Sequence, residues 1–145
     1  MSILHIQFGV IVKRGVNMHP DLFLDVAKDW ADNHPTCEGH FRSSISRAYY
    51  AAFHFSRGTV EALELEQPAD TGSHKRIILA LKRSGDKELS ALGRKLEALK
   101  VIRESADYDI HYPLPVQNLE LSIRKAENII ERCQEQLSSD QQSGS

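Results

Sequence analysis

A row of leucines at helical spacing, followed by an arginine, is the feature that most constrains this fold. Leucines stand at positions 89, 92, 96 and 99, and the next step of the same three-to-four spacing is Arg103. This spacing places the side chains on one face of an α-helix, which has to be buried against other elements. A cation that continues a buried face costs free energy unless a partner neutralises it. Arg103 is therefore either half of a structural ion pair or a place where a phosphate binds.

Helical spacing continues through the rest of the chain after residue 18, with neither sustained alternation nor a hairpin signal. Ser73 is placed to cap the third of the expected helices. Amphipathic helices joined by short loops predict an all-α fold, an antiparallel four- to five-helix bundle. The narrow apolar faces of the first and last helices leave room for a partner subunit. We expect helices over residues 20–32, 37–65, 73–81, from the Ser84–Asp86 interruption to residue 106 or 107, and 116–137.

The two ends of the chain fit the bundle less well than residues 18–137, which we expect to form the domain. Residues 1–17 alternate like a strand. They are either a short arm that packs on the bundle or across a dimer, or a segment that precedes a natural start at Met18. The polar tail, residues 138–145, is expected to be disordered.

The composition favours a single cytoplasmic domain without metal or cofactor. With 145 residues, 41% of them hydrophobic, the chain can bury one sizeable core. No apolar run approaches the roughly 20 residues of a membrane span. The cations at positions 13 and 14 follow the N-terminal apolar run, unlike those of a secretory signal. Cys37 and Cys133 lack the spacing of a zinc site, and the seven histidines show no HxxxH pattern.

The charge is unevenly distributed along the chain. The net charge of −2 argues against a protein that coats nucleic acid indiscriminately. Residues 74–103, however, carry nine Lys and Arg against three acidic residues, whereas residues 18–70 carry four against nine. This asymmetry predicts either a basic face on an otherwise acidic molecule or ordinary solvated helix faces.

Three segments resemble the signature of HEPN domains, the small all-α domains named for higher eukaryotes and prokaryotes nucleotide-binding. They are the block at residues 42–54, which includes Arg47, Tyr49, Tyr50 and Phe53; the 72–75 segment with His74 and Lys75; and Arg103 with Ala106–Tyr108. The resemblance covers about residues 20–135 and implies a helical bundle that commonly dimerises.

Many HEPN domains resemble metal-independent endoribonucleases, often toxins held by a nucleotidyltransferase-type or other antitoxin. The resemblance implies a motif in which an arginine is followed, after four to six intervening residues, by a histidine. The motif of one protomer faces that of the other across a dimer. Here seven residues separate Arg103 from His111, and Tyr108 occupies the place of the histidine at the shortest spacing. The alternative is a non-catalytic HEPN module that binds a nucleotide or a protein partner.

RNA cleavage without metal requires a base, an acid and a cation at the phosphate. His111 suits the proton transfers, because histidine titrates near pH 6.5, and Arg103 suits the phosphate charge. Tyr108 or Tyr112 would donate a hydrogen bond to the phosphate. A helix that stayed regular to residue 110 would place 103, 107 and 110 on one face, with His111 one residue around.

Structural roles compete with each of these assignments. Arg103 with Asp107, and Lys100 with Glu104, are spaced for i,i+4 ion pairs. Arg47 either meets an acidic residue at 107–109 or joins a phosphate site. His74 and Lys75 in the first turn of a predicted helix are candidate nucleotide contacts. Tyr49, Tyr50, Phe53 and His54 fit packing between helices or across a dimer better than base stacking.

Overall fold

The computed structural model describes residues 19–33 and 37–143, with side chains as far as residue 142. No strand occurs within these ranges, and the all-α prediction is confirmed. The predicted arm or alternative start at residues 1–17 and the predicted break at 34–36 lie outside the described residues. The helices are α2 (Asp21–Asn33), α3 (Glu38–Ala62), α4 (Ser73–Lys82), α5 (Lys87–Tyr108) and α6 (Gln117–Ser143).

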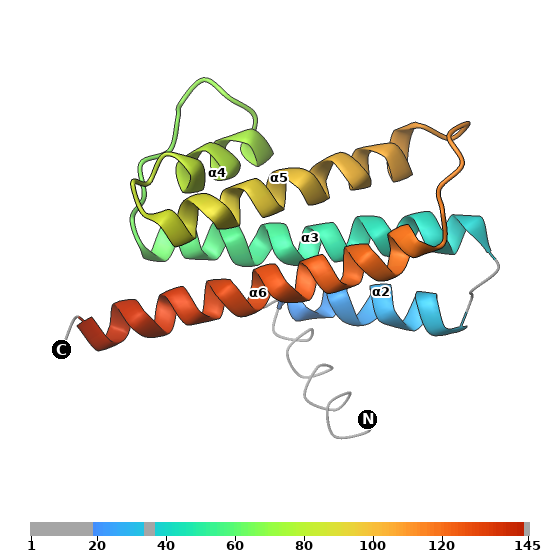
Figure 1. Cartoon of the computed structure of the whole chain (residues 1–145), viewed down its shortest axis with the longest axis horizontal. Helices are drawn as coiled ribbons and strands as arrows, with labels where there is room; N and C mark the ends of the chain where they lie inside the picture. The colour runs from blue at the N-terminus through green and yellow to red at the C-terminus, as the bar shows by residue number, and fades with distance from the viewer. Residues whose placement is uncertain (1–18, 34–36, 144–145) are drawn as a thin grey trace, which may run out of the picture.

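The long helix α3 is the centre of the bundle, with α2 and α6 along one side and α5 along the other (Figure 1). Successive long helices run in opposite directions, as predicted for an antiparallel bundle, so that α3 and α6 point the same way (Figure 1). The short helix α4 packs mainly against α5. None of the described helices is long and apolar enough to cross a membrane.

The helix boundaries differ from the predicted ones at three places. Helix α3 ends at Ala62, three residues early. Gly72, whose backbone is extended (φ −62°, ψ 157°), caps α4, so Ser73 is its first helical residue and not its cap. Helix α6 continues to Ser143, since no glycine or proline interrupts residues 138–143. The prediction of a disordered tail is therefore wrong for residues 138–143.

The predicted leucine stripe of α5 forms part of the main core. All four leucines are 5% exposed or less, and they pack with buried side chains of α3, α4 and α6. Burial of each such side chain contributes about 1.5–3 kcal/mol. A second, smaller cluster lies near the end of α5 and joins three helices. Its members are Phe41, Ile45, Ala106 and Leu119.

A defined cap sets where the leucine stripe begins. Gly85 adopts a left-handed φ of +84°, which favours glycine and turns the chain out of α4. The Asp86 carboxylate then accepts a hydrogen bond from the Leu89 N–H at 2.9 Å. The cap fixes the rotation of α5, which in turn places Arg103 on its inner face.

Gly93 provides the close approach between α5 and α4, and we predict that Gly93→Ala is destabilising. An added Cβ would lie 2.8 Å from Lys82 Cγ, 3.0 Å from Leu81 Cβ and 3.1 Å from the Ile78 carbonyl oxygen. The expected loss is about 1–3 kcal/mol of unfolding free energy, measured by urea denaturation.

The matched control is Gly58→Ala in α3, where an added Cβ meets nothing within 4 Å. This substitution should stabilise the protein by about 0.5–1 kcal/mol, since it only improves helix propensity. Equal stability of the two variants would contradict the close approach of α4 and α5.

Candidate functional site

Arg103 continues the leucine stripe of α5 into the bundle and is only 6% exposed. Its guanidinium carbon lies 5.0 Å from the ring centroid of Tyr49 and 5.7 Å from that of Tyr50. The Nη1 atom lies 3.4 Å from Asp107 Oδ2, so the predicted ion pair is present. The aromatic faces and the carboxylate offset the cost of burying the cation. Nε, however, is buried without a hydrogen-bond partner.

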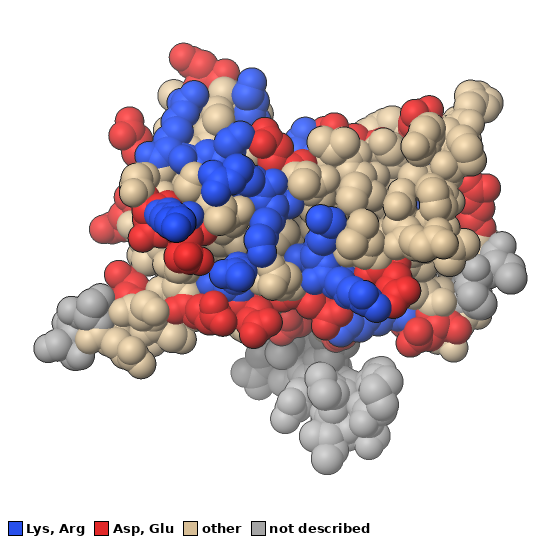
Figure 2. Space-filling view, in the orientation of Figure 1, with Lys and Arg blue, Asp and Glu red and all other residues tan. Residues whose placement is uncertain are grey.

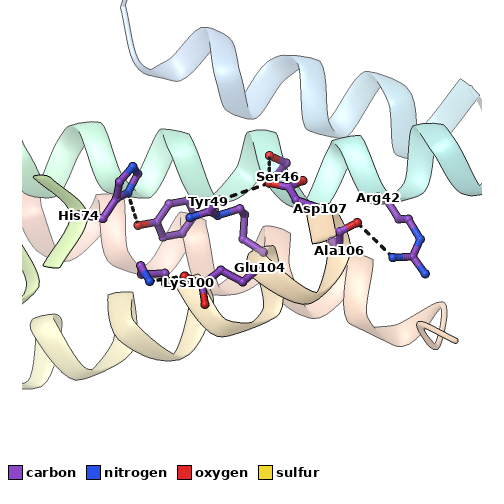
Figure 3. Close-up of polar contacts among 9 residues, drawn as sticks. Arg42, Ser46, Tyr49, His74, Lys100, Glu104, Ala106 and Asp107 are labelled. Carbon is purple, nitrogen blue, oxygen red and sulfur yellow. Dashed lines mark hydrogen bonds and ion pairs between the residues drawn. The ribbon is translucent and has the colours of Figure 1, made fainter. Parts of the chain in front are cut away.

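Tyr49 connects Arg103 on α5 to His74 on α4. The Tyr49 hydroxyl lies 2.7 Å from His74 Nδ1, and the two side chains point toward each other in Figure 3. Arg103 lies against the ring of the same tyrosine. Because Tyr49 is fully buried, its own proton needs an acceptor, and His74 Nδ1 is the one within reach. The proton of neutral His74 therefore sits on Nε2.

Burial and the neighbouring charges keep the Tyr49 hydroxyl and the His74 imidazole uncharged. Burial, followed by the charges of Arg103 and Lys100, lowers the pKa of His74. Burial raises the pKa of Tyr49. His74 also stacks on the Phe53 ring, with the two centroids 4.2 Å apart. The imidazole is thus held in one orientation and one tautomer, as a hydrogen-bond donor through Nε2.

The first turn of α4 adds backbone donors beside His74. The first intrahelical bond of α4 runs from the Arg76 N–H to the Gly72 carbonyl at 2.9 Å. The N–H groups of Ser73, His74 and Lys75 therefore have no acceptor within the helix. Gly72 has no side chain to cap them. These groups and the helix dipole favour an anion at this end of α4.

Lys100 adds a cation one helical turn before Glu104. Its ammonium donates to Glu104 Oε1, which is the predicted i,i+4 pair (Figure 3). This hydrogen bond lowers the pKa of the Glu104 carboxyl. The Lys100 side chain remains 26% exposed. We call Tyr49, Tyr50, His74, Lys100 and Arg103 together the Arg103 cluster.

The residues predicted at the end of α5 do not join this cluster. Helix α5 ends at Tyr108, close to the predicted end at residue 106 or 107, so the condition under which residue 110 would share the face of Arg103 is not met. His111 and Tyr112 lie in the exposed connection to α6, and Tyr108 is 76% exposed. No hydrogen bond or ion pair among the described residues joins His111 to Arg103.

Leu114 packs this connection against the smaller core cluster, and hydrogen bonds from one side chain of α3 hold its backbone. Arg42 Nη1 donates to the carbonyls of Ser105, Ala106 and Asp109 at 3.1–3.2 Å, and Nη2 donates to that of Tyr112 at 2.6 Å. These acceptors include carbonyls that the end of a helix leaves unpaired. Arg42 thus fixes the position of the segment that carries His111, and Figure 3 shows its contact with Ala106.

The other predicted contacts divide between the cluster and other surfaces. Asp107 pairs with Arg103 and accepts a hydrogen bond from Ser46 at 3.3 Å. Lys75 follows His74 and is exposed. Arg47 lies over the Phe23 ring of α2, 5.8 Å from its centroid, and pairs with no acid at 107–109. No three His, Cys, Asp or Glu side chains of the described ranges gather as metal ligands would.

Two parts of this site were not predicted from the sequence. Arg42 reaches carbonyls 63–70 positions away, and Tyr49 meets His74 across 25 positions. Both residues lie in the HEPN-like block at residues 42–54, and this resemblance was the only sequence signal that pointed to them. Periodicity cannot show such contacts, because it reports which face is buried and not which side chains meet across it.

We predict that the free energy of unfolding falls in mild acid, because the fold disfavours protonation of His74. Unfolded His74 binds a proton below about pH 6.5, whereas the folded residue does so only at a lower pH. Its contribution is therefore complete above pH 6.5 and is lost as the pH falls toward the folded pKa. His74→Gln should reduce the drop in urea midpoint between pH 7.5 and pH 5.5.

The exposed His111→Gln is the control for this measurement, and it should keep the full drop. His54, whose pKa burial also lowers, remains in both variants and accounts for part of the residual drop. An unchanged drop in His74→Gln would show that the imidazole is not held neutral by the fold.

Comparison with known protein families supports the resemblance seen in the sequence. No curated protein matches the chain closely enough to count as a relative. The family model of the HEPN domain matches residues 26–136, which include every described helix except the first turn of α2 and the end of α6. The match covers well over half of the chain and includes the whole Arg103 cluster. The chain belongs to the HEPN domain family.

Proposed function

We propose that this HEPN protein binds the phosphate groups of RNA at the Arg103 cluster. The observation that carries the proposal is the set of contacts that joins three helices: Arg103 lies against the Tyr49 ring, and the Tyr49 hydroxyl is hydrogen-bonded to His74. Because the Tyr49 hydroxyl occupies Nδ1, the Nε2–H of a neutral imidazole in the uncapped first turn of α4 is left to bind a ligand. Phosphate oxygens only accept hydrogen bonds, and the groups gathered here are mainly donors.

The members of the cluster have different tasks in this proposal. Arg103 is too covered to be the main contact, so it acts through Tyr49 and supplies positive charge from beneath. The partly exposed His74 and Lys100 and the N–H groups of α4 would touch the phosphate. Tyr50 is also partly exposed and offers a ring edge to a base.

RNA binding should weaken when the exposed donors are removed. We expect His74→Ala and Lys100→Gln each to weaken binding of a labelled single-stranded RNA about fivefold to tenfold at 100 mM salt. Tyr49→Phe, which leaves His74 without its positioning partner, should weaken it less. Fluorescence anisotropy measures the affinities, and circular dichroism checks the fold.

Arg57→Gln is the charge-matched control, because Arg57 lies on α3, pairs with Glu61 and has no contact with the cluster. It should bind like the parent protein. Equal affinities of the control and the Lys100 variant would rule out the cluster as the binding site.

A second candidate function is metal-independent cleavage of RNA by a homodimer. The observation that favours it is the group of exposed apolar side chains around His111, which we call the uncharged end. Its members are Tyr108, Ile110, Tyr112 and Val116, between 51% and 76% exposed. Figure 2 shows few charges in this region, whereas Lys and Arg gather over α4, the first half of α5 and α6.

A second copy of the chain is the partner that we propose for the uncharged end. Paired across it, two His111 side chains would face each other on connections that Arg42 holds in place. One imidazole would take the proton of the 2′-hydroxyl as its oxygen attacks phosphorus. The other would protonate the departing 5′-oxygen, leaving a 2′,3′-cyclic phosphate. An antitoxin or nucleotidyltransferase partner would then cover the same end, and it should co-purify in stoichiometric amount.

Cleavage should persist in EDTA and depend on both His111 and dimerisation. We expect His111→Ala to lose cleavage at least a hundredfold while it still binds RNA. Ile110→Asp should give monomers in analytical ultracentrifugation and lose cleavage as well. Intact RNA with the parent dimer would leave the binding function standing and remove the nuclease.

A further inference from the structure

A shallow groove between α5 and α6 has the chemistry of a second anion site. It has a volume of about 190 Å³, is open to solvent, and is lined by Lys95, Arg124, Lys125 and Asn128. No carboxylate is among the lining residues.

The groove offers donors almost exclusively. Lys95 Nζ donates to Asn128 Oδ1 at 2.6 Å, and this oxygen is the only side-chain acceptor of the lining. The Asn128 amide is thereby oriented so that its NH₂ group is left for a ligand. Lys125 has no ion-pair partner among the described residues, and both lysine ammonium groups keep further N–H donors. A ligand that fills this groove must bring acceptors.

The neighbouring acids neutralise the groove only weakly. Arg124 pairs with Glu120 in an i,i+4 pair whose side chains are 73% and 68% exposed. Such pairs contribute little and exchange readily with other partners. Glu127, the nearest acid in sequence, pairs with Lys28 of α2 instead. Positive charge therefore remains on the α5–α6 side of the bundle.

The groove is continuous with the basic surface of the molecule. Figure 2 shows Lys and Arg side chains running from α4 across α5 to the middle of α6. Lys95 and Lys100 stand five positions apart on α5, which is about 7.5 Å along the helix axis and about 140° around it. At about 3.4 Å per nucleotide, a strand that passes over the outer face of α5 therefore needs at least about three nucleotides between the two sites. Ala98 and Val101 are exposed on that face, and Glu97 there pairs with Lys82.

We infer that the α5–α6 groove binds a second phosphate of the same RNA strand whose first phosphate lies at the Arg103 cluster. The inference rests on the proposed function and extends it. The strand would cross the outer face of α5 between the two sites. The bound RNA therefore spans at least about three nucleotides, and a mononucleotide reaches only one of the sites.

The test uses the salt dependence of binding of a labelled 20-nucleotide oligouridylate. Loss of one phosphate contact reduces the slope of log affinity against log salt by about 0.7 for a single strand. We expect this reduction, with about fivefold weaker binding at 100 mM salt, for Lys95→Gln combined with Lys125→Gln. Binding of uridine monophosphate should be unchanged in the same variant.

A variant with the same change in net charge provides the control. Arg47→Gln combined with Arg57→Gln lies on α3, lines no part of the groove, and should keep the parent slope. If both double variants give the same slope while Lys100→Gln still weakens binding, the groove inference fails and the proposed function stands. If the parent protein binds no RNA, both fail.

Competition with an acidic peptide tests whether the ligand of the α5–α6 groove is RNA or an acidic protein segment. Deca-glutamate should displace the RNA only at concentrations well above those of unlabelled oligouridylate. Tighter binding of the peptide than of the RNA, lost in the Lys95 and Lys125 variant, would overturn the assignment to RNA.

Discussion

The burial of one guanidinium group organises the functional side of this bundle. Arg103 is a cation in the position of a core leucine, and its burial is tolerable only because Tyr49, Tyr50 and Asp107 surround it. Removing these neighbours would leave an unpaired buried charge, which costs more than the pairing itself contributes. The contact therefore fixes how α3 and α5 lie against each other.

The structural and functional interpretations of Arg103 are compatible. The Asp107 pair uses Nη1 and the guanidinium lies against the Tyr49 ring, while Nε stays without a partner. A group that only held two helices together would be expected to satisfy all its donors. A buried charge also acts at a distance, because the protein interior screens it less than water does. Arg103 can thus raise the positive potential at His74 without being reached by a ligand.

The sequence was sufficient for the helices and the core because both depend on local spacing. The leucine stripe, the break before Asp86 and the i,i+4 pairs of Arg103 and Lys100 are properties of single helices. The cluster depends instead on contacts between α3, α4 and α5. Tyr49 was correctly assigned to packing, but its hydroxyl partner depends on where α4 docks, which Gly93 determines. Arg42 is missed for the same reason.

The late position of His111 relative to the family motif has a structural consequence. With α5 ending at Tyr108, Arg103 faces the bundle and His111 lies beyond the helix end, on the surface. Within one chain the two residues therefore serve different surfaces: a donor-rich one near α4 and an apolar one near the start of α6. A reaction that needs both Arg103 and His111 therefore requires a partner chain to bring the two surfaces together. Phosphate binding at the Arg103 cluster requires no partner, because its donors all come from α3, α4 and α5 of one chain.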